Sequence, residues 1–441
     1  MRARGLGARR RAALIGACSL LCGAALAVAG PAQAGPFPGV PDPGGDPNAA
    51  VPVPPSGKFF GYHENSAELG THGWTPAELA EVARGGGANL LRFHLDWWNV
   101  EPQRDKWGEV WWGKYARLYD ALRANGIRPL ITLGGVPPWA RPVTGLLCGT
   151  HRGCEYPPEP GMDDEWAEFA AEVARRFPET AAIEIWNEPN TQEFWKPLPS
   201  PWRYAQLVAA AYPAIKAANP NVRVLTGGLA PTQRRVYDLL GKIVKMPMRQ
   251  FLQAAYTTTP SIKDKIDGIS FHTVFNQLDY GAESLWAKAF WDVRSTAAAY
   301  GDAGIELWLS ETGLTTSGPQ AYSETQQAAG LVAQYRRLMT MPDLKGMVIH
   351  TLAERVEMPP TDPARGHGLV RSFSPFGPKQ GFCEFAGRVA TSTPYGGCPP
   401  IVDTGPGDAP GGQDPGGGGG GSPSLNDLLD GLLGGLLGRR P

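Results

Sequence analysis

The sequence of 441 residues has few cysteines, no excess of charge of either sign, and no long apolar run after roughly its first thirty residues. Lys and Arg number 41 against 42 Asp and Glu, so the net charge of -1 gives no electrostatic basis for nucleic acid or an anionic membrane as the main partner. No later apolar run is long enough to span a bilayer. The zinc-binding spacings C-x-x-C and H-E-x-x-H do not occur, and we expect neither a metal nor an organic cofactor.

The two ends of the chain differ in composition from its middle. Residues 1–34 combine an arginine-rich start, an apolar stretch and an A-Q-A cleavage motif, which predicts a signal peptide and a secreted or extracellular protein. Residues 35–56 are a Pro-rich spacer and residues 401–424 a Gly/Pro-rich linker, and we expect both extensions to be disordered. Residues 425–441 carry leucines every three or four positions. This tail docks on a membrane or another envelope component, self-associates, or is a disordered end.

Cysteines are few but suit an oxidising compartment. Four of the 6 follow the predicted signal peptide and would be exported with the mature chain. In an oxidising compartment outside the cytoplasm these cysteines would form disulfides. Four cysteines allow three pairings, and proximity in the sequence favours Cys148 with Cys154 and Cys383 with Cys398. The alternative, a zinc site, has no support from the spacing.

The middle of the chain alternates short β-rich runs with segments of helical periodicity. Helix starts are predicted at Thr75, where Glu78 completes a capping box, and at Ser323 with Gln326. Strand-then-helix units across residues 57–400 predict a (β/α)8 TIM barrel, with a doubly wound sheet as the alternative. The expected strands are residues 58–63, 89–94, 129–133, 182–187, 222–226, 268–272, 306–310 and 346–351.

Two of these strands lead into a glutamate, Glu188 and Glu311. The carboxyl ends of parallel barrel strands meet at one mouth, so these two side chains should face each other there. Hydrolysis of a glycosidic bond needs such a pair: a carboxylic acid protonates the leaving oxygen, and a carboxylate meets the developing oxocarbenium carbon. Glu184 and Glu306 lie too deep along their strands to share the mouth. Glu354 follows the eighth strand and is a candidate substrate contact.

The sequence around both glutamates resembles the clan A glycoside hydrolases, which are retaining (β/α)8 enzymes. The motifs are W-N-E-P-N at residues 186–190 and S-E-T-G at residues 310–313, and the resemblance covers residues 58–388. The segments R-F-H at residues 92–94 and F-W-K-P at residues 194–197 are similar to family 39 and related bacterial exopolysaccharide endoglycosidases.

This resemblance implies a role for each matched residue. Glu188 would be the acid/base and Glu311 the nucleophile. Asn187 would hydrogen-bond the sugar 2-hydroxyl. Arg92 would hold Glu311 ionised, because an opposite charge nearby lowers the pKa of a carboxylate.

Two strand ends depart from the clan pattern. His272 is not followed by the Pro-Tyr common there, so the tyrosine that usually contacts the nucleophile is missing or supplied by another residue such as Tyr280. The eighth strand ends I-H-T-L, without the tryptophan common as a sugar platform. Both departures concern the floor of the sugar subsite, so they bear on substrate identity more than on reaction type.

Histidines and tryptophans at or just after strand ends are further candidates. The histidines suggest groups that bind sugar hydroxyls, and the tryptophans can stack on the apolar faces of sugars. Packing inside the core is the alternative interpretation for each. The residues concerned are His63, His94, His272, Trp98, Trp139 and Trp195.

Together these features predict a secreted, retaining glycoside hydrolase that cleaves a polysaccharide or glycoconjugate by double displacement. The retaining route implies carboxyl groups about 5–5.5 Å apart. Two alternatives stay open: a non-catalytic carbohydrate-binding protein on a degenerate barrel, and a transglycosylase that uses the same residues.

Overall fold

The computed structural model describes residues 51, 54–64, 74–148, 154–273, 284–373, 376–386 and 398. The predicted signal peptide, most of the Pro-rich spacer, the Gly/Pro-rich linker, the leucine-rich tail and Tyr280 lie outside these residues, so the predictions for them stay predictions. None of the helices in this part of the chain combines the length and apolar character that a bilayer crossing requires.

Eight parallel strands close into a barrel, which confirms the (β/α)8 prediction and excludes the doubly wound sheet. Around the barrel the order is β1-β10-β9-β8-β5-β4-β3-β2. Each predicted strand is found, with its ends displaced by no more than two residues. The barrel strands are β1 (Phe59–His63), β2 (Leu90–Asp96), β3 (Arg128–Gly134), β4 (Ala182–Asn187), β5 (Arg223–Gly228), β8 (Gly268–His272), β9 (Glu306–Thr312) and β10 (Leu344–His350).

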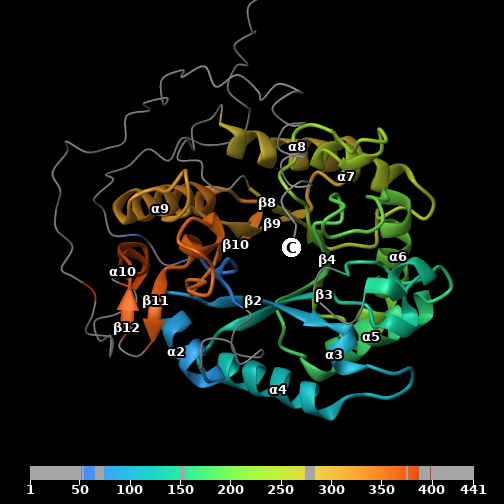
Figure 1. The fold of residues 1–441 in the computed structure, drawn as a ribbon, viewed down its shortest axis with the longest axis horizontal. Coiled ribbons are helices and arrows are strands. Elements are labelled where there is room, and N and C mark those ends of the chain that lie inside the picture. The colour runs from blue at the N-terminus through green and yellow to red at the C-terminus, as the bar shows by residue number, and fades with distance from the viewer. Residues whose placement is uncertain are drawn as a thin grey trace, which may run out of the picture. The chain divides into compact units, whose positions relative to one another are not determined.

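Helices surround the strands and bury one face against them (Figure 1). Both predicted capping boxes are present, at Thr75 with Glu78 and at Ser323 with Gln326, and each satisfies backbone N–H groups at a helix start. The α-helices are α2 (Pro76–Gly85), α3 (Trp97–Val100), α4 (Glu109–Ala124), α5 (Asp163–Arg176), α6 (Pro201–Ala218), α7 (Met248–Thr257), α8 (Leu285–Ala299), α9 (Glu324–Thr340) and α10 (Gln380–Ala386).

The inside of the barrel changes from apolar to polar toward the mouth. Alternate residues of a strand point to the same side, so Leu90, Arg92 and His94 of β2 occupy successive levels. The lowest level is a separate apolar cluster of buried side chains that includes Leu90, Leu225 and Trp308. Gly346 makes room for Trp308, since a Cβ there would lie 2.4 Å from the indole. The apolar floor therefore carries a polar layer above it.

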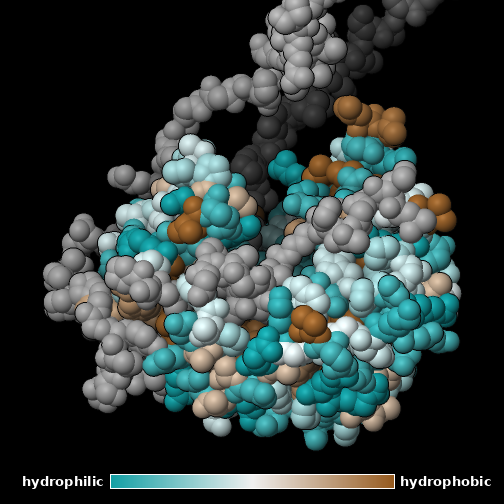
Figure 2. All heavy atoms as spheres, turned by 60° about the horizontal axis from the view of Figure 1, so that its bottom comes forward, coloured by the Kyte–Doolittle hydropathy of each residue, from teal (hydrophilic) through white to brown (hydrophobic). Residues whose placement is uncertain are grey.

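Two hairpins outside the barrel were not predicted. They are β6 (Val236–Tyr237) with β7 (Ile243–Lys245), and β11 (Val370–Phe373) with β12 (Phe376–Pro378). Their strands are too short to show a clear period in sequence. The β6–β7 turn exposes Leu239 fully, and Figure 2 shows apolar patches of this kind separated by hydrophilic surface.

The predicted disulfide between Cys383 and Cys398 is present, with 5.4 Å between the Cα atoms. It ties α10 to a residue beyond the helix. Cys154 is buried, but the side chain of Cys148 lies outside the described part of the structure, so that pairing stays a prediction.

We expect Leu225→Ala to lower the free energy of unfolding by about 2–5 kcal/mol, because it opens a cavity in the barrel floor. The same change at Leu239, which is 105% exposed, should alter it by less than about 0.5 kcal/mol. Urea denaturation of both variants measures the difference. Equal losses would show that Leu225 is not part of a close-packed floor.

Candidate active site

Arg92 lies fully buried within the barrel and connects three strands. Its Nε donates to Glu184 Oε2 at 2.7 Å, its Nη2 donates to Asn187 Oδ1 at 2.9 Å, and its Nη1 donates to Glu311 Oε1. A buried cation is stable only when it is paired and hydrogen-bonded. One guanidinium thus fixes a carboxylate, an amide and a second carboxylate from β4 and β9.

Glu184 sits below the mouth, as predicted, and neutralises Arg92 from beneath. It also accepts hydrogen bonds from Thr132 Oγ1 at 2.6 Å and from Ser270 Oγ. Burial would raise the pKa of Glu184, but the charge of Arg92 and these hydroxyls outweigh it and lower the pKa. Its position along the strand was enough to exclude Glu184 from the mouth. Its supporting role was missed, although a buried arginine between strands calls for more than one counter-charge.

Glu311 lies among positively charged and polarisable groups at the mouth and is 7% exposed. Besides Arg92, its carboxylate is 3.8 Å from His272 Nε2, 3.6 Å from His63 Nδ1 and 3.7 Å from His350 Nδ1. Burial alone would raise the pKa of Glu311. His272, Arg92, His350 and His63 more than offset that effect and hold the pKa well below its usual range. Glu311 is therefore ionised at neutral pH.

Glu188 and Glu311 lie on two sides of one imidazole. His272 Nδ1 is 2.8 Å from Glu188 Oε1, while its Nε2 is 3.8 Å from Glu311 Oε1. Burial lowers the pKa of His272, but the two carboxylates outweigh it and raise the pKa. With both ring nitrogens protonated, His272 can donate to Glu188 and face Glu311 with positive charge. The structure thus brings the two predicted catalytic glutamates to one mouth.

A strained turn presents Glu188 at the end of β4. Trp186 has φ 78° and Glu188 has φ 43°, both in the left-handed region that side chains other than glycine rarely adopt. The buried Asn190 fixes the turn, since its Nδ2 donates to Ala230 O at 3.0 Å and its Oδ1 accepts from Ala230 N at 2.8 Å. Glu188 N also donates to Gly228 O at 2.9 Å. Hydrogen bonds to the end of β5 and the residues that follow it thus stabilise this strained turn.

The last residue of β5, Gly228, leaves the space that His272 fills. A Cβ at this position would lie 2.1 Å from His272 Nε2 and 2.8 Å from Ser310 Oγ. The sequence carries no signal for this packing, because the three residues come from different strands.

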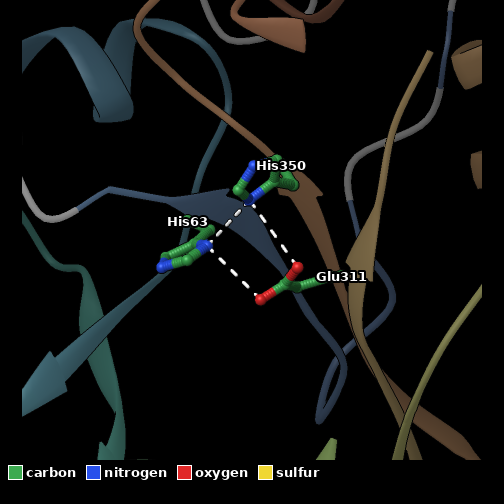
Figure 3. A group of neighbouring side chains, drawn as sticks. All are labelled: His63, Glu311 and His350. Carbon is green, nitrogen blue, oxygen red and sulfur yellow. Dashed lines mark hydrogen bonds and ion pairs between the residues drawn. The ribbon is translucent and has the colours of Figure 1, made fainter. Parts of the chain in front are cut away.

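Other histidines complete the mouth. His63 Nδ1 is 2.9 Å from His350 Nδ1, the ring of His63 stacks on His94 at 5.2 Å, and His367 packs edge-on against His350 at 5.8 Å (Figure 3 shows His63, His350 and Glu311). His350 and His367 were missed. His350 ends β10 just as His63 ends β1, so the same strand-end signal could have found it. His367 comes from a 3-10 helix, Pro363–His367, and has no such signal.

The three predicted tryptophans differ in burial: two are half-buried and one is buried. Trp98 is half-buried, with the guanidinium of Arg141 5.5 Å from its ring centre, and Trp139 is half-buried and donates to Glu101 O at 3.0 Å. Their role in sugar stacking stays a prediction.

Trp195 does not lie in the mouth, so the prediction of a stacking role for it is wrong. It is 1% exposed and packs edge-on against Trp186 and Tyr204, which leaves no ring face for a sugar. The cause is local: Trp195 N donates to Thr191 O at 2.8 Å, and this turn folds the indole back into the core.

The remaining acids have structural partners. Glu306 pairs with Arg223 at 2.7 Å at the start of β9, away from the mouth as predicted. Glu354 pairs at 2.5 Å with the buried Lys379. Its suggested substrate contact stays a prediction.

Buried histidines should make the fold sensitive to acid. Burial lowers the pKa of His350 to about 4 and that of His367 to about 3, against 6.5 for an unperturbed histidine. Their contribution to stability is full above pH 6.5 and is lost as the pH falls toward the folded values, by roughly 1 kcal/mol per pH unit for each group. We expect urea denaturation to show a lower free energy of unfolding at pH 4.5 than at pH 7.

The shifted pKa values of His272 and Glu311 do not hide this effect. His272, whose pKa is raised, gains stability only as the pH falls toward 6.5, and Glu311, whose pKa is lowered, loses its contribution only below its unfolded value near 4.5. His367→Asn should flatten the slope. A free energy of unfolding that is constant from pH 6.5 to pH 4.5 would contradict buried neutral histidines.

Comparison with known proteins places this chain in a recognised enzyme class. The model of the family described as cellulase, glycosyl hydrolase family 5, matches residues 54–341, more than half of the chain. The predicted clan A resemblance is confirmed, whereas the narrower placement beside family 39 is not, because the matching family is a different member of the clan.

Solved structures share the fold at low identity. A family 39 glycoside hydrolase from the gut symbiont Bacteroides cellulosilyticus WH2 is 19% identical with a TM-score of 0.54, over 78% of this chain and 66% of the other. A family 1 β-glucosidase from Thermotoga maritima is 15% identical with a TM-score of 0.51, over 76% and 97%. An exo-β-1,4-mannosidase from Opitutaceae bacterium strain TAV5 is 17% identical with a TM-score of 0.52, over 75% and 59%.

At these identities the structures establish the barrel alone, and the chain spans just under two thirds of the length of the family 39 enzyme. The family match carries the assignment. The chain belongs to the cellulase family, glycosyl hydrolase family 5, and is a glycosidase that acts on O-glycosyl compounds.

Proposed function

We propose that this glycosidase is a secreted, retaining enzyme that hydrolyses a polysaccharide or glycoconjugate by double displacement. Glu311 is the nucleophile and Glu188 the acid/base. The observation that carries the proposal is the opposed setting of the two groups: Glu311 is held ionised by His272 and Arg92, and Glu188 lies across His272 from it.

In the first step the Glu311 carboxylate attacks the anomeric carbon and forms a carbon–oxygen bond. The bond to the leaving oxygen breaks, and Glu188 transfers its proton to that oxygen. Because Glu311 is kept ionised by fixed charges, it needs no base to activate it.

In the second step Glu188, now a carboxylate, takes a proton from water. The water oxygen bonds to the anomeric carbon, and the bond to Glu311 breaks, which restores both groups. His272 stays beside both carboxyl groups. It can therefore compensate the negative charge, which lies on Glu311 before the first step and on Glu188 after it.

Asn187 is set to recognise the sugar. Its Oδ1 accepts from Arg92 Nη2 at 2.9 Å, which orients the amide and leaves its NH2 group to donate to a hydroxyl. This orientation supports the expected contact with the 2-hydroxyl. His63 and His94 stack beside the same mouth as further hydroxyl-binding candidates.

The N-terminal 34 residues support secretion, and the leucine-rich tail supports a contact with the cell envelope. The opposed glutamates favour catalysis over the alternative of carbohydrate binding alone, because a binding protein gains nothing from an ionised carboxylate buried among cations.

Conservative replacement of either glutamate should lower turnover strongly while the fold survives. We expect Glu311→Gln to lower kcat/KM at least about 10³-fold on activated aryl glycosides, and Glu188→Gln to lower it about 10²–10⁴-fold on glycosides with a poor leaving group, which need the acid. The matched control is Glu306→Gln, on the same strand as Glu311 but paired with Arg223 away from the mouth, which should keep near wild-type activity. Equal turnover by wild type and Glu311→Gln would overturn the assigned roles.

Loss of the bridging imidazole should change the pH profile. In His272→Asn the largest positive influence on Glu311 disappears, so the pKa of Glu311 should rise. The nucleophile is active above its pKa, and we therefore expect the acidic limb of kcat/KM to move to higher pH. His94→Asn removes a mouth histidine that stacks on His63 and serves as the comparison. An acidic limb that stays in place in His272→Asn would contradict this electrostatic role.

A further inference from the structure

Three metal-ligating side chains converge on one point of the mouth. His63, Glu311 and His350 come from the ends of β1, β9 and β10, and each offers one ligand atom within 4.8 Å of the others (Figure 3). The Nδ1 atoms of the two histidines face each other at 2.9 Å. The Nδ1 of His63 lies 3.6 Å from Oε1 of Glu311, and the Nδ1 of His350 lies 3.7 Å from Oε2.

These spacings suit a small divalent transition metal. A tetrahedral Zn²⁺ site with bonds of about 2.0–2.1 Å holds its donor atoms roughly 3.3 Å apart. The two Nδ1 atoms, 2.9 Å apart, are near this spacing, and one Glu311 oxygen lies within 4.8 Å of both, so small side-chain shifts would complete the set. Two imidazoles and one carboxylate are also a ligand set that zinc uses when its fourth position is open. Harder ions such as Mg²⁺ and Ca²⁺ prefer oxygen ligands and fit this set poorly.

The site is held in place before any ion arrives. His63 and His350 are direct neighbours in the β1–β10 register, so the backbone fixes their separation. The ring of His94 stacks on His63, and the ring of His367 packs against His350. At most one proton can lie between two Nδ1 atoms 2.9 Å apart, and a metal ion would take its place.

Neighbouring positive side chains should lower the affinity for a metal ion without preventing its binding. Arg92 and His272 already contact Oε1 of Glu311, so an incoming ion must compete with two positive groups. The second oxygen, Oε2, faces His350 at 3.7 Å. We expect binding that is reversible by a chelator.

We propose that His63, His350 and Glu311 form an inhibitory site for zinc-class divalent ions, which bind the Glu311 carboxylate and withdraw it from reaction. The inhibition rests on the proposed role of Glu311, whereas the binding does not. A bound ion would occupy the oxygen lone pairs that Glu311 uses as a nucleophile and would block the approach of a sugar.

The test is calorimetric titration of the full-length protein with ZnCl₂, paired with aryl glycosidase assays. Wild type should bind one Zn²⁺ at this site and lose activity, and EDTA should restore it. His350→Asn and His63→Asn should each weaken binding at least about tenfold. The loss of one ligand should also abolish the visible absorption of a bound Co²⁺ probe. Two independent ligand variants, checked by circular dichroism, guard against a single misfolded one.

The variant Glu188→Gln separates metal binding at this site from the catalytic activity of the enzyme. It leaves all three ligands in place, so it should bind Zn²⁺ as wild type does while turning over poorly. Wild-type affinity in both histidine variants would overturn the metal site even if Zn²⁺ inhibits. Binding lost in the histidine variants, but with Glu311→Gln as active as wild type, would support the site and overturn the proposed nucleophile.

Discussion

The need to neutralise one buried guanidinium organises the inside of this barrel. Arg92 has no solvent to stabilise it, and its three nitrogens reach Glu184 below, Asn187 beside and Glu311 above. The arrangement keeps Glu311 charged in a site where burial alone would favour the neutral acid. Because the partners come from β4 and β9, this contact also sets where those strand ends lie relative to β2.

The fold and the central pair could be predicted because their signals are local. Each barrel strand is a β-rich run between helical segments, and each capping box occupies four consecutive residues. Once a parallel barrel is assumed, a glutamate at a strand end must lie at the mouth, which placed Glu188 and Glu311 together. The level of Glu184 followed in the same way, from the rise along a strand.

The rest depended on contacts between distant segments. Trp195 follows a strand end, as a sugar-stacking residue would, yet a turn folds it into the core. His367 reaches the mouth from a 3-10 helix, and a side chain at Gly228 would occupy the space that His272 and Ser310 fill. No spacing within the chain encodes these contacts.

The central claim is that Glu311 is the ionised group that bonds to the sugar. The most direct measurement is mass spectrometry of the protein treated with activated 2-deoxy-2-fluoro glycosides, which slow the second step more than the first. We predict a mass gain of one fluorosugar per chain, located on the peptide that contains Glu311. A label on another acid, or retained activity with no label while the same sugar is hydrolysed with inversion, would contradict the account.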